Sequence, residues 1–128
     1  EDMPGYTFTR RAPEATYQMS PAVMARMREQ LRLAEGAGLR SDDGDGAWLL
    51  EEDVVRFGPR GRIPVTATFA RGVVAEVFWD DTQHVLRRRS RLVKCEVNGA
   101  GVSERGLKLG DKVRVGGSTF TYRMLKRI

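Results

Sequence analysis

A length of 128 residues allows one modest domain and excludes two ordinary ones, and the apolar (41%) and charged (30%) fractions are those of a folded chain. No apolar run approaches the ~20 residues of a membrane-spanning helix, and the first residues lack the apolar core of a signal peptide. We therefore expect synthesis in the cytosol and no membrane partner. The formal net charge of +5 favours an acidic partner, either nucleic acid or an acidic protein surface.

Residues 1–19 are polar and irregular, with prolines at Pro4 and Pro13. We expect an extended arm that is ordered only where it lies on another surface, either the rest of its own domain or a neighbouring subunit. In a subunit contact, the arm would use its aromatic and basic side chains, Tyr6, Phe8, Arg10 and Arg11.

A helix is predicted over residues 20–36. Ser20 is a favourable N-cap, and Pro21 follows at the first helical position, where its missing N–H costs nothing. Apolar residues then recur at three- and four-residue spacing: Val23, Met24, Met27, Leu31 and Ala34. We expect this stripe to pack against the core. Gly36 and Gly38 are expected to end the helix.

From Ala47 onward the apolar period changes to two, which predicts short strands at 53–57, 62–70 and 73–79 and one long or two short strands within 84–97. A parallel sheet is excluded because its crossover helices are missing. The predicted fold is mainly β: a small β-barrel or strongly bent antiparallel sheet with one N-terminal α-helix, forming a single domain over residues 20–128.

The clearest element is a closing hairpin over residues 107–127. Gly116 and Gly117 suit a two-residue turn, since glycine permits the positive φ angles that match strand twist. One face of the hairpin would carry its apolar side chains, Val113, Val115, Phe120, Tyr122 and Met124.

The strongest metal-like pattern is the acidic, glycine-rich segment from Ser41 to Glu52. Aligned with a calcium-binding loop, it places Asp43, Asp45 and Glu52 at the third, fifth and twelfth positions. The first position is serine and no helix follows, so we favour a plain loop with no metal. Asp43, Asp45 and Glu52 remain weak calcium candidates.

Little in the sequence indicates catalysis. His84 is the only histidine, and no serine or cysteine is tied to it by a motif, so a structural histidine is expected. Asp80 and Asp81 lie on a predicted turn, where adjacent side chains point apart. Cys95 lies between apolar neighbours and is expected to be a small buried residue. We expect no enzyme activity and no cofactor.

Positive charge is concentrated between Leu86 and Arg91. In an extended chain, Arg87, Arg89 and Arg91 would line one face, opposite Arg88. Such a ladder could contact phosphates without base specificity, or could discourage strand pairing between molecules at a sheet edge. We take these four arginines as candidate contacts for DNA or a protein partner; a merely solvated face is an equal alternative.

Two binding families share a phrase near the C-terminus. "CEVNGAGV" (95–102) and "LKLGDKVRVGG" (107–117) resemble the last strands of a forkhead-associated (FHA) domain, a phosphothreonine-peptide reader that begins with a Gly-Arg pair, here Gly61-Arg62. The "VNG…GD" phrase also resembles an S4 RNA-binding domain. Either resemblance implies a small recognition module for phosphopeptides or nucleic acid, which is our alternative interpretation.

A third resemblance covers more of the chain. The order of helix, two strands, long loop between Trp79 and Leu92, strand and hairpin is similar to the small head-completion (head–tail joining, or neck) proteins of tailed bacteriophages. That family's hairpin pattern is matched by Leu107, Gly110, Asp111, Val113, Val115, Gly117 and Phe120.

The phage resemblance, our main interpretation, implies a structural virion protein assembled in the host cytoplasm. Copies would form a homo-oligomeric ring that closes the DNA-filled head below the portal and provides the tail attachment surface. The partners of the ring would be the portal or adaptor ring and the tail proteins. The loop between Trp79 and Leu92 would also contact packaged DNA non-specifically.

Overall fold

The computed structural model describes residues 20–66 and 71–127. The arm predicted at 1–19, with Tyr6, Phe8, Arg10 and Arg11, lies outside them. The described elements are α2 (Pro21–Gly36), β1 (Ala37–Ser41), β2 (Ala47–Leu49), β3 (Val54–Phe57), β4 (Ala75–Trp79), β5 (His84–Arg88), β6 (Cys95–Val97), β7 (Ala100–Gly101), β8 (Glu104–Gly106), β9 (Lys112–Val115) and β10 (Ser118–Met124).

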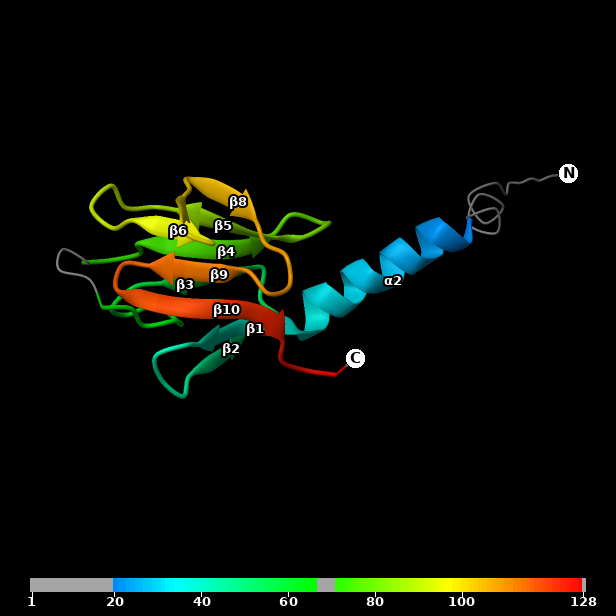
Figure 1. Ribbon diagram of the computed structural model, residues 1–128, viewed down its shortest axis with the longest axis horizontal. Helices are drawn as coiled ribbons and strands as arrows, with labels where there is room; N and C mark the ends of the chain where they lie inside the picture. The colour runs from blue at the N-terminus through cyan, green and yellow to red at the C-terminus, as the bar shows by residue number, and fades with distance from the viewer. Residues whose placement is uncertain (1–19, 67–70, 128) are drawn as a thin grey trace, which may run out of the picture.

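The strands form two antiparallel sheets that stack face to face (Figure 1). One sheet has the order β2-β1-β10-β9-β6-β7 and the other the order β3-β4-β5-β8. The predicted class, mainly β with one N-terminal helix, is confirmed. Among the described residues no strand belongs to both sheets, so the domain is a β-sandwich and not a closed barrel.

The core lies between the sheets and is tied together by aromatic rings. Phe120 packs edge-to-face on Phe57 of the opposite sheet, with ring centroids 5.6 Å apart, and on Trp48, 5.9 Å apart. The predicted closing hairpin is confirmed, because Ser118 pairs with Val115 across a two-residue turn. Its inward side chains are buried: Val113, Val115, Phe120 and Tyr122.

Strand β1, which we did not predict, begins immediately after α2. Gly38 lies inside it and pairs with Arg123 of β10. A Cβ atom at this position would overlap the backbone oxygen of Trp48 and the side chain of Leu125. Gly38 therefore permits a close approach within the sheet rather than ending the helix.

Two other strand predictions change in detail. In the predicted strand 62–70, Ile63 forms one isolated parallel bridge with Phe57, residues 64–66 are not strand, and residues 67–70 lie outside the described chain. The segment 84–97 forms two short strands, β5 and β6, separated by a loop over 89–94.

Helix α2 begins as predicted, with the Ser20 hydroxyl accepting a hydrogen bond from the Val23 amide at 3.2 Å. The expected burial of its apolar stripe is wrong, because the helix projects from one end of the sandwich as a separate rod (Figure 1). Met24, Met27 and Leu31 are 46%, 50% and 56% exposed. No helix within the described residues is both long and apolar enough to cross a membrane.

Candidate functional site

Several loops meet at the end of the sandwich opposite α2 (Figure 1). They are the segments 58–62, 71–74 and 89–94 and the turn at 116–117, which together we call the arginine end. Backbone hydrogen bonds join them, since Val74 donates to Phe57 at 2.9 Å and Gly116 donates to Lys94 at 3.0 Å. The loops are therefore held in fixed relative positions by the ends of the strands.

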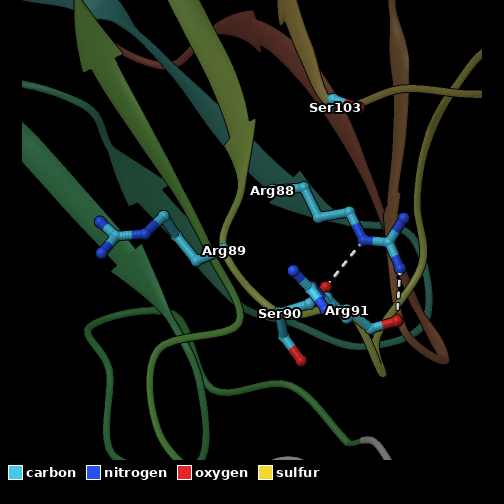
Figure 2. Close-up of a pocket in the computed structure, with 5 residues that line it drawn as sticks. All are labelled: Arg88, Arg89, Ser90, Arg91 and Ser103. Carbon is cyan, nitrogen blue, oxygen red and sulfur yellow. Dashed lines mark hydrogen bonds between the residues drawn. The ribbon is translucent and has the colours of Figure 1, made fainter.

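Arg88 fixes the conformation of the 89–94 loop. Its Nε donates to the backbone oxygen of Ser90 and its Nη2 to that of Arg91, both at 2.7 Å (Figure 2). The carbonyl of Val74 accepts from the amides of both Arg89 and Ser90, at 2.9 and 3.1 Å. Arg88 therefore orders the loop through its Nε and Nη2 groups.

Arg87 and Arg89 converge on one buried carboxylate. The Glu76 side chain is only 5% exposed, and it accepts from Arg89 Nη1 at 2.9 Å and from Arg87 Nη1 at 3.3 Å. Arg87 also donates to Glu104 at 3.1 Å, and its guanidinium lies 4.2 Å from the ring centroid of Phe78. Arg87 is thus part of the sheet surface, whereas Arg89 stands at the edge of the loop.

Two open hollows flank Arg89 and Ser90. One, of about 320 Å³, is lined by Arg88, Arg89, Ser90, Arg91 and Ser103 (Figure 2). The other, of about 460 Å³, is lined by Arg71, Gly72, Val73, Val74, Arg89, Ser90 and Leu92. No carboxylate is among the described residues that line either hollow. Guanidinium groups around an open, carboxylate-free hollow are suited to binding a phosphate.

The arginine run thus separates into three roles. Arg89 and Arg91 line the hollows, Arg88 lines one of them and also braces the loop, and Arg87 pairs with carboxylates on the sheet. Sequence reasoning missed Arg71 and gave Ser90 no binding role, because only the hydrogen bonds of Val74 bring these segments together.

The remaining candidate residues have separate partners. Asp43 Oδ2 accepts from the Thr119 amide at 3.2 Å, whereas Glu52 lies 3.8 Å from Arg62, the arginine of the predicted Gly-Arg pair. Within residues 20–66 and 71–127, no three potential metal ligands cluster, so the structure does not bring Asp43, Asp45 and Glu52 together.

His84 lies in the core, where its Nδ1 is 2.6 Å from the Tyr122 hydroxyl and its Nε2 is 3.0 Å from the carbonyl oxygen of Leu50. Burial lowers the pKa of His84 and raises that of Tyr122. Burial also raises the pKa of the Cys95 thiol to about 11, which disfavours the reactive thiolate. Asp80 accepts from the amides of the turn that follows β4, and these bonds lower its pKa.

No family model and no curated protein sequence matches the chain. Solved structures do. An FHA domain from a study of phosphothreonine-dependent interactions is 27% identical, covers 72% of this chain and 99% of its own, and has a TM-score of 0.62. The FhaA FHA domain, solved with the intracellular domain of Rv3910, is 26% identical over 68% of this chain and 99% of its own (TM-score 0.61).

Mycobacterium tuberculosis EmbR, in complex with a low-affinity phosphopeptide, is 18% identical over 84% of this chain and 31% of its own, with a TM-score of 0.67. These matches overturn the main interpretation. The assignments to the phage neck, to a virion, to a ring and to portal, tail or packaged-DNA partners are wrong, because the similar folds are FHA domains. The hairpin pattern fits both families, and the described chain has an FHA-like β-sandwich fold.

Proposed function

We propose that the chain is a phosphopeptide-binding module that recognises phosphothreonine at the arginine end. The observation that carries the proposal is the pair of adjoining hollows, which share Arg89 and Ser90 and are open to solvent. The likeness to FHA domains, one from a study of phosphothreonine-dependent interactions, supports the same ligand class.

The local geometry suits a phosphate with a charge of about −2. Arg89 is held by Glu76 through one nitrogen, so its guanidinium is oriented while other N–H groups remain for a ligand. The Ser90 oxygen accepts from the Leu92 amide at 3.1 Å, which leaves the hydroxyl hydrogen free to donate. Arg91 lines one hollow and Arg71 the other, so each hollow has a further guanidinium beside the shared Arg89.

Discrimination against the unphosphorylated peptide would rest on the phosphate itself, whereas the expected preference for phosphothreonine over phosphoserine rests on the likeness to FHA domains. Each charge-assisted hydrogen bond contributes about 1.5–3 kcal/mol, so two or three of them separate phosphothreonine from threonine by several orders of magnitude. Recognition would involve binding alone, with no chemical step.

A degenerate peptide library with a central phosphothreonine, compared with the same library carrying threonine or phosphoserine, tests the proposal. We expect selective retention of the phosphothreonine peptides by the purified chain and its loss in the Arg89→Ala/Arg91→Ala variant. Arg123→Ala, which removes one exposed charge at the other end of the sandwich, is the matched control and should bind normally.

Equal retention of all three libraries would overturn the proposal. So would tight binding of single-stranded RNA or DNA with no preference for phosphopeptides, which would support the nucleic-acid alternative.

A further inference from the structure

Helix α2 carries an apolar face that no described part of the chain covers. Met24, Met27 and Leu31 are about half exposed, and Ala34 continues their three- and four-residue spacing. These are the a and d positions of a heptad, which form the seam between paired helices. Leu33, which packs against the core, lies on the opposite side of the helix, so the seam faces away from the sandwich.

Two charges border this seam on the same side. Arg28 and Glu35 are seven residues apart and occupy successive e positions of the heptad. The described residues give neither of them an ion-pair partner. By contrast, Arg32 and Glu29 lie farther round the helix and pair with each other at 2.7 Å.

We propose that two copies of this chain pair through α2 in antiparallel orientation. About the two-fold axis, Met24 packs against the partner's Ala34, and Met27 against the partner's Leu31. Arg28 of each copy then faces the partner's Glu35, so a single arrangement satisfies both charges and covers the seam.

Charge also selects the orientation. In a parallel pair, Arg28 would lie beside the partner's Val23, and Glu35 beside the partner's Gln30, which gives no opposite-charge contact. The antiparallel pair gives two such contacts by symmetry, both on the same edge of the interface and one on each side of the two-fold axis.

The shape of the molecule permits this arrangement. The helix spans about 24 Å, and the sandwich is attached only at its C-terminal end (Figure 1). Antiparallel pairing therefore puts the two sandwiches at opposite ends of the helix pair. Their arginine ends point outward, away from the interface, and remain free.

The pairing should be reversible. Four helical turns bury much less surface than the standard protein interface of about 1,600 Å², and interfaces of that standard size already extend to micromolar affinity. The dimer should therefore form in the micromolar range or above, and its population should depend on protein concentration.

Sedimentation equilibrium of the full chain from about 10 to 500 µM tests the inference. We expect a monomer–dimer equilibrium whose dissociation constant rises at least tenfold in Met27→Glu and in Leu31→Glu. Arg26→Glu, which places the same charge on the opposite side of the helix, should dimerise like the parent chain. Circular dichroism controls for folding, since all of these side chains are exposed.

A charge exchange tests the orientation. Arg28→Glu alone and Glu35→Arg alone should each weaken the dimer because like charges meet, and the double variant should restore it. A monomer at all concentrations, a dimer insensitive to Leu31→Glu, or a double variant no stronger than the single variants would each overturn the proposal. None of these results depends on whether the arginine end binds phosphopeptides.

Discussion

Replacing Tyr122 with phenylalanine should destabilise the fold through one hydrogen bond. The Leu50 carbonyl only accepts, so His84 Nε2 carries the proton, and Nδ1 must accept from the Tyr122 hydroxyl at 2.6 Å. His84 and Tyr122 are 1% and 0% exposed, so water cannot take the place of the hydroxyl. The variant keeps the aromatic ring and leaves Nδ1 without a donor.

The expected cost follows from that geometry. A buried acceptor left without its partner costs about 1–3 kcal/mol, which for a chain of this size lowers the melting temperature by roughly 4–12 °C. The edge-to-face contact of the Tyr122 and His84 rings, with centroids 5.6 Å apart, should persist and add nothing to the loss.

Thermal and urea unfolding at pH 7.5, followed by circular dichroism, measure this loss. Thr121→Val is the matched control, because it removes a hydroxyl from the neighbouring residue, where its bonds to Asp42 and Lys112 lie at the surface. That control should lose less than half as much. An unchanged melting temperature in Tyr122→Phe would refute the assignment of the hydroxyl as the partner of Nδ1.

Three further predictions concern the ligand, the pH and the backbone. Arg89→Ala and Arg91→Ala should each weaken phosphothreonine-peptide binding roughly 10- to 150-fold by isothermal titration calorimetry, and an equal affinity would remove that arginine from the site. Burial lowers the pKa of His84 in the folded chain below 6.5, so the unfolded chain takes up a proton first as the pH falls. The free energy of unfolding should therefore decrease as the pH drops below about 6.5, and this decrease should be less steep in His84→Gln. Gly38→Ala should cost about 1–3 kcal/mol in urea unfolding, and Gly101→Ala, where an added Cβ meets nothing within 4 Å, should cost much less; equal losses would contradict the close-approach argument.

The elements that depend on contacts between residues close in sequence were predicted correctly. The N-cap at Ser20, the two-glycine turn of the closing hairpin and its alternating apolar face were all read correctly from neighbouring residues. Strand β1 was missed because glycine frequently ends helices, and Gly38 was therefore interpreted as the end of the helix. The structure instead requires glycine at position 38 because the chain closely approaches Trp48 and Leu125, a contact that the local sequence does not show.

The candidate site was harder to predict. The charge run located the loop, but which arginines remain available depends on Glu76 and on backbone oxygens that no pattern reveals. Arg71 reaches the site only because the carbonyl of Val74 anchors the 89–94 loop. The FHA resemblance was present in the C-terminal hairpin, but a Gly-Asp turn followed by alternating strands suits many small β folds. The order of the other elements then favoured the phage neck family, which the similarity to FHA domains contradicts.

The most direct test of the phosphopeptide proposal is an NMR titration of the ¹⁵N-labelled chain with a short phosphothreonine peptide, using its threonine counterpart as the control. We predict saturable shifts of the amides of Gly72, Arg89, Ser90 and Arg91 with the phosphorylated peptide only, while the amides of α2 stay unchanged. Shifts that are absent at millimolar peptide, equal for both peptides, or confined to surfaces outside the arginine end would contradict the proposed function.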